Sequence, residues 1–264
     1  MKKDAITLLD GSSWSKKELM EKMRDDNFYY GYMGRATLSS SAVKMLADSP
    51  KVYQYHLNGH DIEGAALDVG GLVHHMILEP EKVEDYYVIV DVSSRQTNAF
   101  KDAKNSNSAK TVVTRKEYEG AERCSLAARK NPHIMEALNE SIFETPIVGE
   151  ISGLPFRAKA DLLSSDGERM YDIKTTSDVK SFRKSAHLYC YNAQAYIYCS
   201  LFNVKPENYK YLVVDKGSYD IGVFSVSEEF MMSGEALVNK AINNYLEYFV
   251  RGVDLNSYTI QETL

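Results

Sequence analysis

A change of hydrophobic periodicity near residue 140 constrains the fold of this chain more than any other feature. After it, Phe156, Ala158, Ala160 and Leu162 alternate with charged residues, which is the pattern of a strand with one buried face. Asp166-Gly167 follows as a hairpin turn signal. Further strands are predicted at 169–175, 209–214 and 221–226, and helices at about 179–202 and 228–250. This succession of strands and helices predicts an α/β fold, with a mixed central sheet flanked by helices.

The part of the chain before residue 140 is predicted to be mainly helical. Thr114 and Glu117 have capping-box spacing, so a helix should begin there and end near Lys130. Other helices are expected at about 15–24, 42–46, 50–58 and 64–78, with a short strand at 86–92. No linker marks the change near residue 140. We therefore expect a polar, helical extension over residues 1–36 and a single domain over 37–264.

The bulk properties exclude several classes of protein. None of the apolar runs approaches the roughly 20 residues needed to span a bilayer. The start, Met1 to Asp4, lacks the apolar stretch of a signal peptide, so we expect a cytoplasmic protein without a membrane partner. Three cysteines without CxxC spacing, Cys124, Cys190 and Cys199, argue against a disulfide framework and against thiolate metal sites.

One stretch is basic although the chain has a net charge of −6. Between residues 95 and 116 a single acid, Asp102, stands against six basic residues: Arg95, Lys101, Lys104, Lys110, Arg115 and Lys116. Affinity for phosphate comes from nearby Lys and Arg, so this stretch could contact DNA. A solvated polar loop would have the same composition, and both interpretations stay open.

The predicted hairpin carries the residues with the clearest chemistry. On its first strand Asp161 shares a face with Lys159 and Arg157, and on its second strand Asp172 and Lys174 lie two residues apart. Antiparallel pairing across the turn can bring the two aspartates together. Carboxylates suit Mg²⁺, and a neighbouring ammonium can stabilise charge on a phosphate in the transition state. A surface ion pair at a strand end is the alternative.

Two further groups could belong to the same site. His74 and His75 lie on an otherwise apolar helix, so one of them must point inward; a histidine bonded to a backbone carbonyl is the simpler explanation. The spacing of His187, Tyr191, Gln194 and Tyr198 predicts that they share one helix face after the second strand. They could line an active site, or they could be ordinary aromatic packing.

These residues together resemble the RecE-type exonucleases of phages and prophages, within the PD-(D/E)XK nuclease superfamily. The resemblance runs from about Leu38 to Tyr198 and rests on the order of its motifs. The matching segments are Leu38–Lys44 with Ser49-Pro50, the pattern G-x-x-x-H-x-x-x-L-E-P over Gly70–Pro80, Lys110–Thr114, Gly153–Asp161, Asp172–Thr176, and the Q-x-x-x-Y pattern from Gln194 to Tyr198.

The resemblance implies a fold, an activity and roles for single residues. It implies a PD-(D/E)XK core that digests one strand of duplex DNA from the 5′ end, leaving a 3′ tail for an annealing partner. It implies two Mg²⁺ or Mn²⁺ ions held by His74, Asp161, Asp172 and the carbonyl of Ile173, with Lys174 acting on water and Gln194 and Tyr198 supporting the site. It also implies a ring-shaped homo-oligomer. The expected DNA contacts are Arg95, Lys101, Lys104, Lys110, Arg157 and Lys159.

The chain departs from the family pattern at some positions. Ala160 replaces the proline of the superfamily motif, and Lys159 stands where the family often has arginine, which puts a bidentate phosphate contact there in doubt. Glu144 and Glu150 are candidates for a further acidic ligand. The rival hypotheses are an endonuclease or single-strand nuclease of the same superfamily, and a relative that binds DNA without cutting it.

Overall fold

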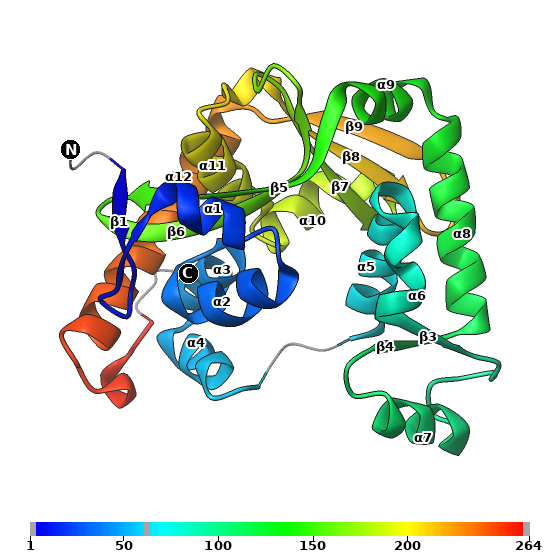
Figure 1. Cartoon of the computed structure of the whole chain (residues 1–264), viewed down its shortest axis with the longest axis horizontal. Helices are drawn as coiled ribbons and strands as arrows, with labels where there is room; N and C mark the ends of the chain where they lie inside the picture. The colour runs from blue at the N-terminus through cyan, green and yellow to red at the C-terminus, as the bar shows by residue number, and fades with distance from the viewer. Residues whose placement is uncertain (1–3, 61–63, 261–264) are drawn as a thin grey trace.

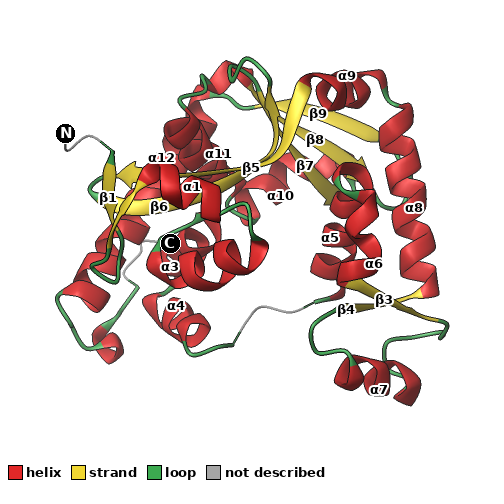
Figure 2. Ribbon diagram, in the orientation of Figure 1, coloured by secondary structure: helices red, strands yellow, loops and turns green. Residues whose placement is uncertain are grey.

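A five-stranded mixed sheet forms the centre of the computed structural model, which describes residues 4–60 and 64–260. Its strand order is β5-β6-β7-β8-β9, and β7 and β8 run parallel while the other neighbours are antiparallel (Figure 2). The strands are β5 (Ser141–Ile151), β6 (Leu154–Ser164), β7 (Met170–Thr176), β8 (Tyr209–Asp215) and β9 (Ile221–Ser225). The predicted mixed sheet is confirmed.

The alternation that predicted β6 is present as alternate burial. Phe156, Ala158, Ala160 and Leu162 are all buried, with at most 1% of their surface exposed. The turn into β7 uses the predicted Asp166-Gly167 pair: the Asp166 carboxylate accepts from the backbone N–H of Glu168, and Gly167 has a φ of 75°. The hairpin therefore forms where the sequence placed it.

Helices cover both faces of the sheet (Figure 1). One face packs against α3 (Ser40–Asp48), α4 (Pro50–Leu57), α10 (Phe182–Leu188), α11 (Tyr191–Phe202) and α12 (Glu228–Tyr245). The other packs against α5 (Ala65–Leu78), α8 (Arg115–Lys130) and α9 (Pro132–Glu140). Most of these helices match expectation, including α8, where the capping box between Thr114 and Glu117 is present.

Smaller elements complete the chain. A parallel pair of strands, β3 (Tyr87–Val90) and β4 (Thr111–Thr114), lies beside α6 (Val83–Tyr86) and α7 (Asn98–Ser106). The basic segment is therefore not all loop, because α7 occupies part of it, capped by Thr97 and anchored by buried Phe100. Short 3-10 or π turns occur at Pro80–Lys82, Val179–Ser181, Pro206–Asn208, Leu246–Val250 and Leu255–Ser257.

The N-terminal segment packs directly onto the sheet. It contains β1 (Ala5–Thr7), β2 (Ser13–Ser15), α1 (Lys16–Lys22), the π-helix η1 (Asn27–Tyr32) and α2 (Met33–Ala36). Its apolar residues form a cluster that includes Val148 of β5. The guanidinium of Arg157, on β6, donates to the carbonyl of Met33 and the hydroxyl of Thr37. The division of the chain into an extension before residue 37 and one domain after it stays a prediction. Both of these parts include residues that lie outside the described ones, namely 1–3, 61–63 and 261–264.

One expected helix is broken into two. Residues 179–202 were predicted as continuous, but Cys190 adopts a left-handed conformation with a φ of 58°, which ends α10 and starts α11 in a new direction. His187 therefore lies on α10, where its ring contacts that of Phe230, and does not share a helix face with Gln194. The prediction of one four-residue stripe was wrong at this point.

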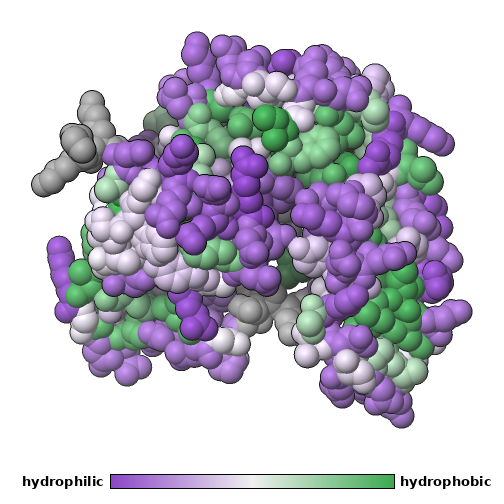
Figure 3. Space-filling model, viewed as in Figure 1, coloured by the Kyte–Doolittle hydropathy of each residue, from purple (hydrophilic) through white to green (hydrophobic). Residues whose placement is uncertain are grey.

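One face of the molecule is largely polar. Hydrophilic residues cover most of the face shown in Figure 3, with apolar patches between them. Among the described residues, none of the helices combines the length and the apolar character that crossing a bilayer requires. All three cysteines are free thiols.

A stability prediction follows from the packing of α12 on α11. A methyl group on Gly234 would overlap the backbone carbonyl of Asn192, whereas one on Gly120 would meet no atom within 4 Å. Gly234→Ala should therefore lower the free energy of unfolding by about 1–3 kcal/mol. Gly120→Ala should raise it by about 0.5–1 kcal/mol, because alanine favours a helix. Urea unfolding of both variants measures these changes, and equal stability of the two would contradict the close packing.

Candidate metal and catalytic site

The site begins where β6 and β7 part. The two strands pair at Leu162 with Tyr171 and at Leu163 with Met170. At the next position, Asp161 turns its carboxylate between the strands and accepts a hydrogen bond of 2.8 Å from the backbone N–H of Ile173. A side chain thus takes the N–H that strand pairing would otherwise use. The gap leaves room for other side chains to reach the carboxylate.

Three acids form a row across the sheet. Phe143 pairs with Leu162 and Thr145 with Ala160, so the register places Glu144 opposite Asp161. Asp161 and Asp172 directly follow the last pair of β6 and β7, Leu162 with Tyr171, so both lie at the point where these strands part. Residues directly opposite on neighbouring antiparallel strands lie close together. Glu144 has a φ of 49°, a conformation that a residue other than glycine adopts only at some cost.

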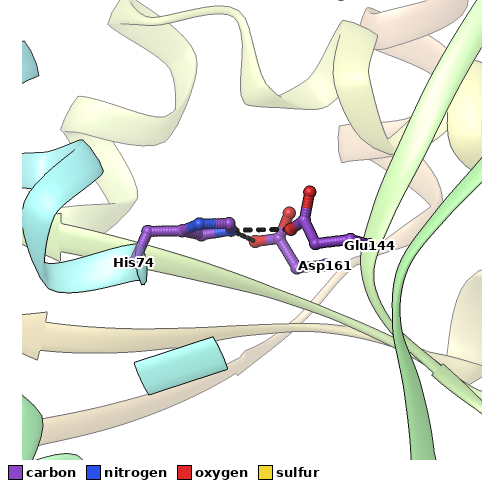
Figure 4. Close-up of side chains that lie close together, drawn as sticks. All are labelled: His74, Glu144 and Asp161. Atoms are coloured by element: carbon purple, nitrogen blue, oxygen red, sulfur yellow. Dashed lines mark ion pairs between the residues drawn. The ribbon is translucent and has the colours of Figure 1, made fainter. Parts of the chain in front are cut away.

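His74 reaches this row from α5. Its Nε2 atom lies 3.3 Å from Asp161 Oδ2 and 3.4 Å from Glu144 Oε1. Figure 4 shows the imidazole pointing from its helix at both carboxylates, which come from neighbouring strands. His75 faces elsewhere: its Nδ1 lies 2.8 Å from the carbonyl oxygen of Gly71. The histidine that the motif singled out is therefore the one that the structure brings to the acids.

Asp172 and Lys174 lie on the same side of β7. Asp172 is only 1% exposed; its Oδ2 pairs with the ammonium of Lys174 and its Oδ1 accepts a 2.5 Å hydrogen bond from Gln194. The Lys174 ammonium also lies 5.0 Å from the centre of the Tyr191 ring. Tyr198 is buried one turn after Gln194 on α11. Side chains from both helical layers therefore meet in the gap between the strands.

The crowded acids shift the pKa values of the site. Burial, and then the charge of Asp161, raise the pKa of Glu144 and that of Asp172 to about 7. Burial acts to lower the pKa of His74, but Asp161 and Glu144 outweigh it and raise that pKa to about 9. The same imidazolium overcomes the effect of burial on Asp161 and holds its pKa below the usual range. Protons and the imidazolium thus offset part of the negative charge.

The donor set fits a divalent cation. One ligand atom each from His74, Glu144 and Asp161 can be chosen so that all lie within 4.8 Å of one another. Glu144 Oε1 is buried without a hydrogen-bond partner among the described residues. Two carboxylates and one imidazole suit Mg²⁺ or Mn²⁺ better than a soft metal. Asp172 lies outside this trio, and its role as a ligand, like that of the Ile173 carbonyl, stays a prediction.

Two further side chains reach the site, and one of them, Asp26, carried no signal in the sequence. Lys159 was predicted to contact DNA, but its ammonium pairs with Asp26 at 2.5 Å and lies 3.4 Å from Glu144 Oε2. Asp26 also accepts from the hydroxyl of Tyr86 on α6. The N-terminal segment therefore forms one wall of the site. Of the two extra acidic candidates, Glu144 is in the site and Glu150 is exposed on β5.

Apart from Lys159, the predicted basic contacts do not gather around the site. Arg157 is 9% exposed and points into the N-terminal segment, a position that argues against a phosphate contact. Arg95 pairs with Asp68 and Glu117, and Lys110 donates to the carbonyl of Glu84. Lys101 and Lys104 lie on α7, which Figure 1 shows at the end of the molecule opposite the five-stranded sheet. Their contact with DNA stays a prediction.

The raised pKa values predict how metal binding depends on pH. Glu144, Asp172 and His74 hold protons near neutrality, and a cation must displace them. Affinity for Mn²⁺ should therefore rise steadily from about pH 6 to about pH 8.5, with protons released on binding. Calorimetry in buffers of different ionisation enthalpy measures both quantities. His74→Ala should release fewer protons, and a pH-independent affinity would show that these groups do not bind the ion.

Comparison with known proteins bears on the fold of the chain. None of the curated proteins matches the chain significantly. A candidate exonuclease from Eubacterium rectale has a similar solved structure, with 14% identity over 91% of this chain and 95% of that one and a TM-score of 0.66, which shows a shared fold. A phage-related exonuclease from Haemophilus somnus 129PT is 12% identical over 81% and 96% of the two chains, with a TM-score of 0.34.

The family profile described as "PDDEXK-like domain of unknown function (DUF3799)" matches residues 39–252, which is most of the chain. The predicted PD-(D/E)XK fold is thereby confirmed. This chain belongs to the PDDEXK-like family DUF3799.

Proposed function

We propose that this protein is a metal-dependent DNA exonuclease that hydrolyses phosphodiester bonds. The observation that carries the proposal is the convergence of Glu144, Asp161, Asp172 and His74, with the ammonium groups of Lys174 and Lys159 beside them. These residues are far apart in the sequence, and the splayed strands bring them to one point. A fold known for nuclease chemistry and this donor set point to the same reaction.

Each side chain has a role that follows from its contacts. His74, Glu144 and Asp161, with Asp172 beside them, would hold Mg²⁺ or Mn²⁺. A bound divalent cation supplies Lewis acidity toward a phosphoryl oxygen and lowers the pKa of water. Lys174 places a positive charge where negative charge develops on the phosphate during attack by water. Gln194 fixes one oxygen of Asp172, and Tyr198 is buried one turn after Gln194 on α11.

An exposed aromatic ring beside the acids supports a nucleic-acid substrate. Tyr30, on η1, is 63% exposed, and its ring centre lies 5.0 Å from the Lys159 ammonium, which also neighbours Glu144. Nucleobases stack on such rings with a gain of about 1–3 kcal/mol per base. A base next to the bond being cut could therefore rest on Tyr30.

The finer features of the proposal rest on the family resemblance. They are 5′-to-3′ digestion of one strand of duplex DNA, two metal ions, assembly into a ring, and transfer of the 3′ tail to an annealing protein. The candidate exonuclease from Eubacterium rectale supports the exonuclease assignment through its shared fold.

Removing the lysine or the central carboxylate should abolish cleavage. Lys174→Ala and Asp161→Asn should each lower the rate of cleavage of linear duplex DNA by at least about a hundredfold. The reason is that the negative charge on the phosphate in the transition state is no longer stabilised. EDTA should stop the wild-type reaction and Mg²⁺ should restore it. Glu150→Gln, at the exposed position on β5, is the control and should retain activity. Full activity of Lys174→Ala would refute the proposed mechanism.

The topology of the substrate separates exonuclease from endonuclease action. An exonuclease needs an end, so we expect the protein to digest linear duplex DNA and to spare a covalently closed circle. Labels at the 5′ or the 3′ end, read on a denaturing gel, show which terminus is lost first. Linearisation of the circle would favour an endonuclease, and early loss of the 3′ label would reverse the proposed polarity.

A further inference from the structure

We propose that a second, basic cleft on this protein binds phosphate groups. The cleft, with a volume of about 600 Å³, lies between the start of α5, one face of α8 and the turn after β8. Its walls include Val69 of α5, the loop from Ser93 to Gln96, and Tyr219. The proposal rests on the proposed function for its main ligand, which is the backbone of the DNA substrate.

Positive charge gathers in this cleft although the chain is acidic overall. Lys116 and Arg123 come from α8, and Lys216 comes from the turn after β8. Lys116, Gly120 and Arg123 lie four and three residues apart and therefore share one stripe of the helix. Among the described residues, these three basic side chains have no ion-pair partner. Hydroxyl and amide groups of Ser93, Ser94 and Gln96 add hydrogen-bonding capacity for oxyanions.

The acid in the lining is already engaged. One oxygen of Glu117 accepts from Arg95 at 2.8 Å and the other from the backbone N–H of Thr114 at 2.8 Å. Arg95 also pairs with Asp68 on α5 at 2.5 Å, so it joins α5, α8 and the loop rather than offering a free charge. Lys116, Arg123 and Lys216 are left to attract a ligand. Phosphate oxyanions are the chemistry that such a set recognises.

One cleft side chain is held in place before any ligand arrives. Arg123 donates through Nε to the hydroxyl of Tyr219 at 2.8 Å, and its guanidinium lies 6.0 Å from the centre of the same ring. Its remaining N–H groups are available to a ligand. Because the side chain is already oriented, binding costs less conformational entropy than it would for a free arginine.

The cleft and the carboxylate site are close enough for one DNA molecule to contact both. The backbone N–H of Lys216 donates to the carbonyl of Thr176, which lies four residues beyond Asp172 on β7. Four residues of strand span about 13 Å. Phosphates on one DNA strand follow each other at about 3.4 Å along the helix axis, so a few nucleotides bridge this distance. On α5, Val69 and His74 point about 140° apart, which makes the cleft a separate surface.

A charge added to the lining of the cleft, at Gly120, tests the proposal. A Cβ atom on Gly120 would meet no atom within 4 Å, and the longer side chain of Gly120→Glu can extend into the cleft, so this variant should fold and place a carboxylate among the basic groups. Gly120→Gln matches it in size without the charge. Asn239→Asp, exposed on α12, adds the same net charge outside the cleft. All three are compared in the Lys174→Ala background with Mg²⁺, so that the DNA is bound and not degraded.

Fluorescence anisotropy with a labelled duplex measures DNA affinity, and calorimetry with a deoxynucleoside monophosphate and with inorganic phosphate measures the small ligands. Gly120→Glu should weaken DNA binding roughly tenfold relative to Gly120→Gln, and it should reduce the slope of log K against log salt by about one to two. Asn239→Asp should change neither the affinity nor the slope. If the two Gly120 variants bind DNA equally but differ in their affinity for the small ligands, the cleft binds a free phosphate compound. If the two Gly120 variants bind DNA equally and also bind the small ligands equally, the proposal is overturned.

The outcome is independent of the test of the proposed function. If the wild type with Mg²⁺ cuts no DNA, the nuclease proposal fails, while the cleft is still judged from the binding measurements. If the wild type cuts DNA and Gly120→Glu binds every ligand as Gly120→Gln does, the cleft proposal alone is wrong.

Discussion

The hydrogen bond from the Ile173 backbone to the Asp161 carboxylate is the contact on which the site depends. A backbone N–H bonded to a charged group contributes about 1.5–3 kcal/mol, which offsets the strand pairing lost at this position. Because Asp161 occupies the gap, β6 and β7 diverge. His74 then enters from one helical layer and Gln194 from the other. A local exchange of hydrogen bonds in one hairpin thus opens the interior of the sheet to polar side chains.

Those polar side chains are costly without a cation. Three acids lie in one row of the sheet, and the pKa values of Glu144 and Asp172 are raised to about 7, first by burial and then by the neighbouring Asp161 charge. Ordinary packing avoids such a cluster, because buried charges are expensive unless they are paired. Lys159, Lys174 and His74 each neutralise part of it. The acid cluster therefore lowers the stability of the metal-free protein, and in return it provides a site that suits divalent ions.

Much of this arrangement could be predicted from local patterns. Alternating apolar residues identified β6, the Asp-Gly turn identified the hairpin, and the pairing of that hairpin placed Asp161 and Asp172 directly after its last pair. Glu144 could only be a candidate, because its place in the row depends on the pairing of β5 with β6. The break at Cys190 could not be predicted, since a non-glycine residue with positive φ has little signature in composition. The ion pairs of Arg95 join residues 27 and 22 positions away, which no local pattern reveals.

The N-terminal segment of this chain acts on the acids from outside the region that the family profile matches. Asp26 holds Lys159, and Lys159 in turn neighbours Glu144, yet the profile shared by the family begins only at residue 39. The charge balance around the acids is thus set in part by residues that lie outside the shared region. In this chain, a substitution confined to Asp26 would therefore change how readily the acids ionise, and with it the pH range of metal binding, while every carboxylate and the histidine of the site stayed in place.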